Sequence, residues 1–308
     1  MKKKISIIGA GNIGGVIGLL LLQKNLGDVV LYDVVEGLPQ GKALDLSHSK
    51  PGIGTDFSII GTNDYKDIAN SDVVIITAGV PRKPGMSRDD LLSINASIME
   101  KVAEGIKVNA PNAFIIVISN PLDAMVTYCQ KKTGISPEKV VGMAGVLDSV
   151  RYRYFLADEL NVSVSSINAL VLGGHGDDMV PVRSATTVNG IPVSKFIPSE
   201  RLNEIEKRVR GAGGEVVSLL KTGSAFFSPA VSAVEMAESY LNDQNKLLAC
   251  ACYLNGEYGV NGFYVGVPAV IGSKGIQKIV EVDLSEEEKA QLNKSIDAVK
   301  DLVSRLPN

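Results

Sequence analysis

The N-terminal half of the chain alternates short apolar runs with longer segments of helical periodicity. Residues 5–8 (ISII) form a β-branched apolar run ended by glycine, which is typical of a buried strand, and residues 13–26 follow as a helix. Further strands are expected at 28–33, 57–61, 72–77, 113–118 and 139–142, and further helices near 37–48, 88–108 and 121–133. Strands that alternate with helices predict a parallel sheet with helices on both faces. We therefore expect an α/β first domain, a doubly wound parallel sheet, over residues 1–145.

The second half of the chain has a different pattern. Residues 167–173 and 262–272 resemble strands that could pair antiparallel, and residues 199–221 and 285–305 resemble long, charged amphipathic helices. Ser285 precedes three glutamates, which is a favourable helix start because acidic side chains suit the positive end of the helix dipole. We interpret residues 146–308 as an α+β substrate domain. Because no low-complexity linker separates the two halves, we expect them to pack closely.

Composition narrows the class of protein. The chain has 308 residues, long enough for two domains, and 21% charged and 45% hydrophobic residues, which is ordinary for a soluble globular protein. The formal net charge of −3 gives no electrostatic support to nucleic-acid binding. The apolar stretch that ends at Leu22 is interrupted by glycines, so we expect neither a secretory signal nor a membrane span. A cytoplasmic location follows as the expectation.

The cysteines predict neither a disulfide framework nor a metal site. Their number, three, is odd, and no histidine lies near Cys250 and Cys252, which would face the same side of a strand. Together with Cys129 they are expected to be buried structural thiols, since free cysteine behaves as a small hydrophobic residue.

The first glycine-rich segment indicates a dinucleotide site. Residues 9–14 (GAGNIG: Gly9, Ala10, Gly11, Asn12, Ile13 and Gly14) lie between the first expected strand and helix. Glycines there permit a tight turn and close approach of a pyrophosphate to the helix N-terminus, as in a Rossmann domain. Asp33 ends the next strand, where a carboxylate accepts hydrogen bonds from adenosine ribose and repels a 2′-phosphate, which favours NAD over NADP. The alternative is a glycine turn that serves packing only.

The two histidines and one aspartate–arginine pair are candidates for chemistry, although a histidine in a turn is by itself more often a surface or satisfied residue. His175 lies in LGGHGDDMVP between Gly174 and Gly176, where the backbone is permissive, whereas His48 lies in a polar segment expected to be a loop with a structural or solvent role. Asp148 and Arg151 are three residues apart and share a face if that segment is helical. Taken alone, the pair is better explained as a simple intrahelical ion pair.

Two further segments carry polar side chains. Residues 79–90 (GVPRKPGMSRDD) contain two prolines and two glycines and form a loop with Arg82 and Arg88, or else simply a solvated basic loop. Asn120 follows the apolar run 113–118 and stands at the carboxyl end of a parallel strand, where ligands bind in such sheets.

In chain order, GAGNIG, Asp33, PRKPGMSR, SNP, GVLDSVR and GGHGD resemble the lactate/malate dehydrogenase family over essentially the whole chain. The resemblance is closest to the malate dehydrogenases that share the lactate dehydrogenase fold. It implies NAD as cofactor and hydride transfer at C2 between (S)-malate and oxaloacetate, a reaction of the tricarboxylic acid cycle. It also implies a homodimer or homotetramer, with the helix near 37–48 packed against a partner.

The resemblance assigns roles to the reacting groups. His175 is the proton acceptor for the malate C2 hydroxyl, which suits a group whose pKa lies near neutrality. Asp148 accepts a hydrogen bond from the other ring nitrogen and stabilises the imidazolium. Arg151 holds the C1 carboxylate in a bidentate fork, and Arg88 stabilises charge on the C2 oxygen when the loop closes.

The remaining assigned roles concern specificity and cofactor contacts. In this family an arginine at the position of Arg82 goes with malate and a glutamine with lactate, because a second carboxylate needs a guanidinium partner in a closed site. Asn120 binds substrate and frames the nicotinamide end. Residues 225–230 (AFFSPA) are expected to line the pocket. The NAD contacts expected in addition to the glycine-rich turn and Asp33 are Asn95, Ile118, Ser119 and Asn120.

Three other functions remain as alternatives. One is a dehydrogenase of the same fold acting on lactate or another 2-hydroxy acid. The second is an NAD-dependent glycosidase of the related superfamily, which needs a metal and a cysteine near the nicotinamide, but neither the NP nor the GGHGD segment contains a cysteine. The third is a non-catalytic NAD-binding module, which would not need His175, Asp148 and three arginines together.

Overall fold

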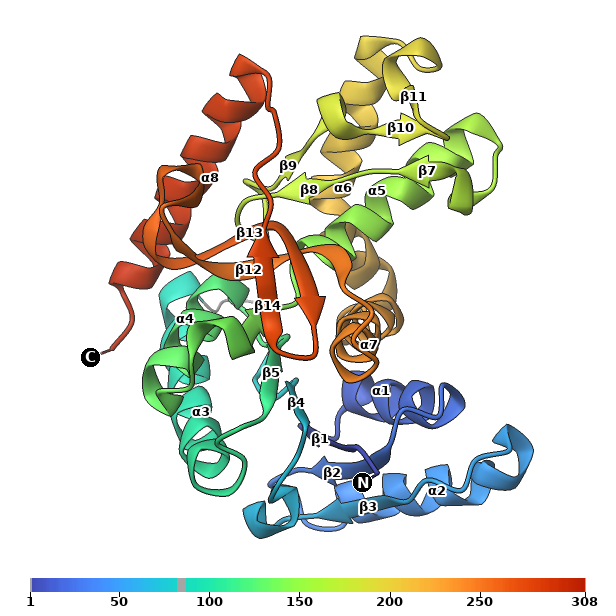
Figure 1. Ribbon diagram of the computed structural model, residues 1–308, viewed down its shortest axis with the longest axis vertical. Helices are drawn as coiled ribbons and strands as arrows, with labels where there is room; N and C mark the ends of the chain where they lie inside the picture. Colours follow the sequence, from blue (N-terminus) through green and yellow to red (C-terminus); the bar gives the residue numbers. More distant parts are fainter. Residues whose placement is uncertain (1, 82–86, 308) are drawn as a thin grey trace.

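Within residues 2–81 and 87–307, which the structure describes, a nine-stranded sheet crosses the molecule and joins its two halves. Figure 1 shows this computed structural model. The strands lie in the order β14-β13-β12-β6-β5-β4-β1-β2-β3. Their bounds are β1 Lys4–Ile8, β2 Asp28–Tyr32, β3 Ile59–Thr62, β4 Val73–Ile76, β5 Phe114–Val117, β6 Val140–Gly142, β12 Lys246–Asn255, β13 Asn261–Gly272 and β14 Gly275–Ile279. The six strands from β6 to β3 pair in parallel, which confirms the predicted doubly wound sheet.

Helices cover both faces of the parallel part of the sheet. Alternate residues of one strand enter different cores: Ile75 of β4 packs in the cluster that contains α1 and α7, and Ile76 packs with α3 and α4. This explains why β4 and β5 are apolar at every position. The α-helices are α1 Asn12–Gln23, α2 Leu38–Ile53, α3 Arg88–Asn109, α4 Leu122–Thr133, α5 Gly145–Leu160, α6 Ser199–Leu220, α7 Phe227–Leu241 and α8 Glu286–Ser304.

The second half adds an antiparallel extension to the sheet and two small sheets. β12 pairs antiparallel with β6 through Ala251 and Gly142, so the sheet continues across the predicted domain boundary near residue 145. The division at that boundary stays a prediction. The short strands are β7 Ile167–Asn168, β8 Val171–Leu172, β9 Val180–Pro181, β10 Thr187–Val188 and β11 Ile191–Pro192.

The expected pairing of 167–173 with 262–272 was wrong for most of its length. The first segment breaks into β7 and β8, which pair with β10 and β9 respectively. Only Gly173 forms an antiparallel bridge to Gly266 of β13. A Cβ on Gly266 would collide with the backbone carbonyl of Gly173, so the two chains approach closely only because glycine stands there.

His48 does not lie in a loop. The helix predicted near 37–48 continues to Ile53, and His48 is an exposed residue of it. Gly54 ends the helix in the left-handed conformation with φ of 77°, which a glycine adopts without steric cost. The serine and proline residues after His48 therefore lie inside the helix and do not interrupt it.

The helix starting after Ser285 and the thiols agree with expectation. Ser285 accepts a hydrogen bond from the amide of Glu288, and the Glu288 side chain bonds back to Ser285, so α8 begins with a capping box. Cys129, Cys250 and Cys252 are all free and buried, with 3.4 Å between the sulfurs of the last two. Burial raises the pKa of the Cys129 thiol to about 12.

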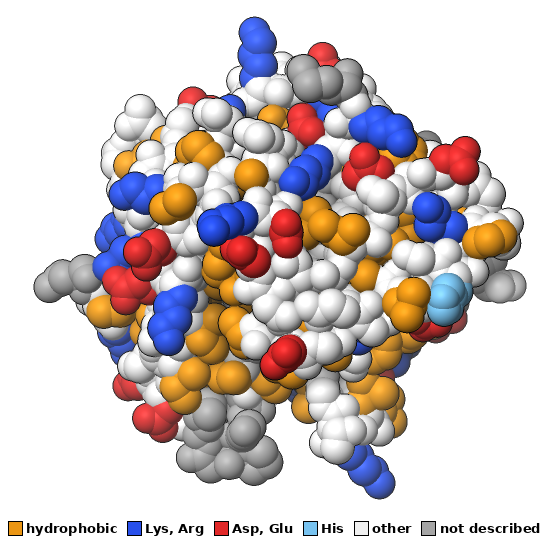
Figure 2. Space-filling view, turned by 90° about the horizontal axis from the view of Figure 1, so that it is seen from below, with side chains coloured by type: hydrophobic (Ala, Val, Ile, Leu, Met, Phe, Trp, Pro, Cys, Tyr) orange, Lys and Arg blue, Asp and Glu red, His pale blue; other side chains and the backbone are white. Residues whose placement is uncertain are grey.

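Two surface properties complete the fold. On the face seen in Figure 2, Lys and Arg side chains are interspersed with Asp and Glu side chains. The helices within residues 2–81 and 87–307 are all too short or too polar to span a bilayer.

Candidate active site

The glycine-rich turn between β1 and α1 is shaped by backbone contact. Gly9 has φ of 111°, and a Cβ there would lie 2.5 Å from Oγ1 of Thr77 at the end of β4. A Cβ on Gly14 would collide with the carbonyl oxygen of Gly9. A Cβ on Gly11 would have no described atom within 4 Å, so this glycine leaves open space beside the turn. Gly9 and Gly14 are thus needed for packing, while Gly11 leaves room for an approaching ligand.

Asp33 closes the turn from the end of β2. Its carboxylate accepts hydrogen bonds from the backbone N–H groups of Ala10, at 2.7 Å, and Val35, at 3.0 Å. Gly11 is the N-cap of α1 and has no side chain that could occupy the first-turn amides, which Asn12 and Ile13 begin. The amides of a helix N-terminus donate to a pyrophosphate and a neighbouring carboxylate accepts from the hydroxyls of an adenosine ribose, so these residues fit a dinucleotide.

Lys42 of α2 contacts this turn, although the sequence analysis did not identify it. Its ammonium group donates to the carbonyl oxygen of Gly11 at 2.7 Å. Burial lowers the pKa of Lys42, and the nearby Asp33 carboxylate partly opposes that shift. The two residues that meet are 31 positions apart, so only the packing of α2 beside the turn reveals the contact.

Asn95 connects two segments at the carboxyl ends of β4 and β5. Its side-chain oxygen accepts from the N–H of Val80 at 2.8 Å, and its NH₂ group donates to the carbonyl oxygens of Val80, at 3.1 Å, and Asn120, at 2.6 Å. Only 2% of Asn95 is exposed. Its amide therefore holds the segments that follow β4 and β5 together, and the expected contact of Asn95 with NAD stays a prediction.

The neighbouring predicted cofactor residues follow β5. Ile118 and Ser119 are buried, and the Ser119 hydroxyl donates to the carbonyl oxygen of Ala78. Asn120 is exposed and precedes a cis peptide bond to Pro121. The exposed side chain of Asn120 thus stands beside the backbone that Asn95 holds.

His175 and Asp148 meet in the second half of the molecule. Nδ1 of His175 lies 2.7 Å from Oδ2 of Asp148, with 15% of the histidine side chain and 2% of the aspartate side chain exposed. Asp148 lies in the first turn of α5, and its other oxygen accepts from Nη1 of Arg151 at 3.4 Å. The predicted ion pair is present, but it uses only one terminal nitrogen of Arg151.

The electrostatic surroundings favour a charged imidazole. Burial by itself lowers the pKa of His175, but the carboxylates of Asp148 and Asp123 outweigh that effect, and the net shift is upward. Burial also lowers the pKa of Arg151, and Asp148 opposes the shift. The cluster therefore contains an imidazole that holds a proton well and a guanidinium with little water around it.

Two buried side chains hold the backbone of the His175 loop. The N–H of Gly174 donates to Oγ of Ser295 in α8, and the N–H of His175 donates to Oδ2 of Asp123 in α4, both at 2.9 Å. Gly173, at φ of 85°, has no room for a Cβ beside Ser295. The sequence analysis missed Asp123 and Ser295, because each meets the loop from a distant part of the chain.

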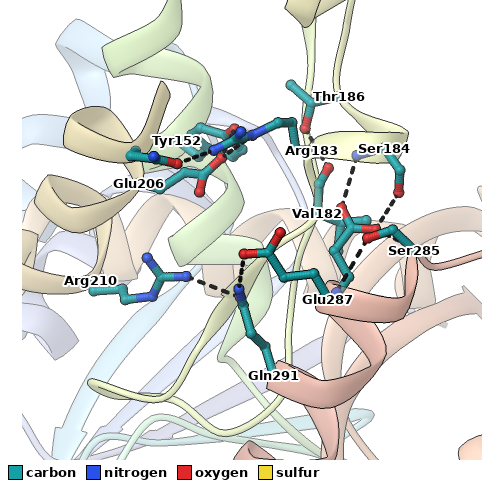
Figure 3. A network of polar contacts seen from close by, with 12 residues as sticks. Tyr152, Val182, Arg183, Ser184, Thr186, Glu206, Arg210, Ser285, Glu287 and Gln291 are labelled. Carbon is teal, nitrogen blue, oxygen red and sulfur yellow. Dashed lines mark hydrogen bonds and ion pairs between the residues drawn. The ribbon is translucent and has the colours of Figure 1, made fainter. Parts of the chain in front are cut away.

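A polar network fastens the same region to α6 and α8 (Figure 3). Arg210 of α6 donates through Nε to the carbonyl oxygen of Met179, four residues after His175, at 3.0 Å, and through Nη2 to Gln291 of α8 at 3.4 Å. Glu206 of α6 accepts from Tyr152 of α5, one position after Arg151, at 3.3 Å. The elements that carry the histidine, the aspartate and the arginine are thereby held in one relative position.

Some predicted residues cannot be placed beside this cluster. Arg82 lies outside the described residues, and Arg88 is the first residue of α3 with its side chain outside the description. In the 225–230 segment, Phe227 begins α7 and is largely exposed. Among the side chains that are described, no group of three His, Cys, Asp or Glu residues is arranged to hold a metal ion.

Comparison with known proteins places these features in a family. The lactate/malate dehydrogenase NAD binding domain matches residues 3–142, and the alpha/beta C-terminal domain of the same family matches residues 145–306. The chain is 57% identical to a malate dehydrogenase of Citrifermentans bemidjiense and 58% identical to one of Geobacter sulfurreducens, with 99% of each chain covered in both cases.

Solved structures of malate and lactate dehydrogenases are also similar to this chain. The malate dehydrogenase of Cryptosporidium parvum superimposes with a TM-score of 0.97 at 54% identity, covering 99% of both chains. A lactate dehydrogenase of the same organism, complexed with lactic acid and NAD, superimposes with a TM-score of 0.97 at 48% identity, covering 100% of this chain and 99% of that one.

Proposed function

The chain belongs to the lactate/malate dehydrogenase family, and we propose that it catalyses the NAD-dependent oxidation of (S)-malate to oxaloacetate and the reverse reaction. The observation that carries this proposal is the cluster of His175, Asp148 and Arg151 in a chain that matches malate dehydrogenases over 99% of its length. The reaction is a step of the tricarboxylic acid cycle.

We propose that NAD is held at the turn between β1 and α1. The first-turn amides of α1 bind the pyrophosphate, with Gly11 leaving space for it, and Asp33 accepts from the adenosine ribose. Ala10, Asn12, Ile13, Ile118 and Ser119 complete the surface along the cofactor. When bound there, NAD would supply the acceptor for the hydride of malate C2.

In the proposed reaction His175 moves the proton. Its Nε2 takes the proton of the C2 hydroxyl as malate is oxidised, and returns it to the carbonyl oxygen when oxaloacetate is reduced. Asp148 accepts from Nδ1, which selects the tautomer with Nε2 free and stabilises the imidazolium that forms.

The substrate carboxylates are assigned to arginines. Arg151 binds the C1 carboxylate, because its second terminal nitrogen is not used by Asp148 and a desolvated guanidinium pairs strongly with a carboxylate. Asn120 hydrogen-bonds the substrate from the end of β5. Arg88 stabilises charge on the C2 oxygen, and Arg82 pairs with the second carboxylate, which a three-carbon acid lacks.

The test of this proposal is oxidation of NADH with oxaloacetate and with pyruvate, side by side. We expect oxaloacetate to be the preferred substrate by kcat/KM. Arg82→Gln should lower turnover of oxaloacetate by several orders of magnitude and raise that of pyruvate, whereas the matched variant Lys83→Gln, which removes the next charge along the chain, should leave the preference unchanged. A wild-type preference for pyruvate would contradict the substrate assignment.

Lactate oxidation is the second candidate function. The observation that favours it is the close superposition on a lactate dehydrogenase complexed with lactic acid. The comparison of oxaloacetate with pyruvate distinguishes the two functions. With a three-carbon acid bound, Arg82 would have no carboxylate partner, so a malate dehydrogenase should turn over pyruvate poorly.

We further propose a homodimer or homotetramer in the cytoplasm. Leu44 on the outer face of α2 is 59% exposed, and exposed apolar residues also stand on α6 and α7, among them Val217, Leu220 and Val231. Leu44→Asp should reduce the mass measured by analytical ultracentrifugation. The matched variant Val108→Asp, on an exposed residue of α3, should leave that mass unchanged. Buried free thiols are in keeping with a reducing compartment.

A further inference from the structure

A second carboxylate, Asp123, lies beside His175 and has no part in the proposed reaction. We infer that Asp123 is a positioning residue: it holds the backbone of His175 in place, and its negative charge favours the protonated imidazole that reduces oxaloacetate. The inference rests on the proposed role of His175 in proton transfer.

The geometry ties Asp123 directly to the His175 backbone. Asp123 is the second residue of α4, and its Oδ2 accepts from the N–H of His175 at 2.9 Å, across 52 positions of the chain. Asn120, which we propose to bind substrate, lies two residues before the start of the same helix, and Asp123 of that helix contacts the histidine loop. A displacement of α4 would therefore move both.

Holding the backbone of His175 does not by itself require a charged side chain at position 123. Only 4% of the residue is exposed, and its Oδ1 has no hydrogen-bond partner among the described residues. A neutral acceptor would hold the His175 amide equally well, whereas a buried carboxylate with one unsatisfied oxygen costs free energy. That cost is offset when an opposite charge forms nearby, and the imidazolium of His175 is such a charge.

The charged groups around His175 leave a role for this second carboxylate. From α5 come Asp148 and Arg151, which pair with each other, and from α4 comes Asp123. A protonated His175 would thus leave an excess positive charge if Asp123 were neutral.

The other charges nearby have their own contacts. On the histidine loop, Asp178 pairs with Lys294 of α8 at 3.1 Å, and Asp177 lies next to it. Arg210 of α6 bonds the backbone of Met179. Burial raises the pKa of Asp123 to about 6, which still leaves it mostly ionised at neutral pH. The carboxylate that His175 meets from α4 is therefore charged under working conditions.

Ser295 provides a matched control. It accepts from the N–H of Gly174, the residue before His175, at the same 2.9 Å and is equally buried, but it carries no charge. Loss of its hydroxyl therefore disturbs the loop mechanically without changing the electrostatics of the imidazole.

The test compares kcat/KM at pH 6.5 and pH 8.5 in both directions for Asp123→Asn and Ser295→Ala. Asp123→Asn keeps an acceptor for the His175 amide and removes the charge. We expect the ratio of oxaloacetate reduction at pH 8.5 to that at pH 6.5 to fall about threefold or more, and malate oxidation at pH 6.5 to rise relative to pH 8.5. Ser295→Ala should lower both directions and leave the pH ratios unchanged.

A second measurement does not depend on turnover. The chain has two histidines, so an NMR titration of their ring protons follows His175 with the exposed His48 of α2 as internal reference. The midpoint of His175 should move to lower pH in Asp123→Asn, and in the shorter neutral variant Asp123→Ser if the asparagine variant does not fold, while His48 stays in place. Unchanged midpoints and pH ratios in a folded variant would overturn the inference. A wild-type chain without turnover would instead defeat the proposed function.

Discussion

Nδ1 of His175 lies 2.7 Å from Oδ2 of Asp148, a contact between a glycine-rich loop and the first turn of a helix 27 positions earlier. The carboxylate is almost completely buried, so water does not compete for this hydrogen bond. The pairing engages Nδ1 and leaves Nε2, the other ring nitrogen, for the proton transfer that we propose.

Replacing Asp148 by asparagine should lower kcat about 10²- to 10⁴-fold, because the amide can stabilise the wrong histidine tautomer and carries no charge to stabilise the imidazolium. Steady-state oxidation of NADH by oxaloacetate measures the effect. Asp158→Asn, at an exposed position of the same helix, is the control and should retain activity. Comparable activity in the two variants would show that the pair is only structural.

The pH dependence should carry the signature of His175. Its pKa is raised in the folded chain, so the imidazole stays protonated to a higher pH than an ordinary histidine. Reduction of oxaloacetate, which needs the proton, should therefore decline with rising pH at a midpoint above the ordinary histidine value. Malate oxidation, which needs the neutral ring, should rise through the same region. Profiles of kcat/KM in both directions test this, and a midpoint below the ordinary value would contradict it.

Gly11→Ala should weaken NADH binding about tenfold or more without loss of stability, because the new methyl group meets no protein atom and occupies space beside the α1 amides. The enhancement of NADH fluorescence measures binding without interference, since the chain contains no tryptophan. The matched variant Gly41→Ala places a methyl group in equally open space on α2 and should bind NADH as the wild type does. Equal affinity in both variants would place the dinucleotide elsewhere.

Asn95→Ala should lower the free energy of unfolding by about 1–3 kcal/mol and raise the KM for oxaloacetate. The change removes three hydrogen bonds and leaves the backbone groups of Val80 and Asn120 without their buried partner. Urea denaturation gives the stability change, and Asn293→Ala, at an exposed position of α8, is the control. A direct contact of Asn95 with the cofactor alone would instead raise the KM for NADH and leave stability unchanged.

The sequence predicted the first half of the fold well because its strands are buried on both faces. Such strands are apolar at most positions, and a glycine follows the first of them after Ile8. The second half was harder. β12 (KLLACACYLN) was not predicted, since its small residues do not alternate with polar ones and one of its partners, β6, is more than 100 positions away in the chain. α7 was also missed, although its buried alanines pack it in the core with α1.

The site was predictable where a motif was contiguous. GAGNIG and GGHGD each predict a turn. The roles of their residues came from the resemblance to a family, because a single residue type does not indicate its role. Asp123 and Ser295 were missed because they meet the histidine loop across 52 and 121 positions. An aspartate in the first turn of a helix is ordinarily explained by the helix dipole, so its sequence position gives no sign of the loop that it holds.

The pairing of β12 with β6 means that the two halves of the chain are not detachable modules. Separating the chain near residue 145 into two fragments would remove the pairing of β6 with β12. Each fragment would then expose an unpaired strand edge that is normally in the middle of the sheet. Unpaired edges pair with strands of other molecules, so we expect each fragment to aggregate when it is expressed alone. The two fragments should regain a defined fold only when they are mixed. The half that carries the glycine-rich turn and the half that carries His175 are thus aligned by the backbone hydrogen bonds of one continuous sheet.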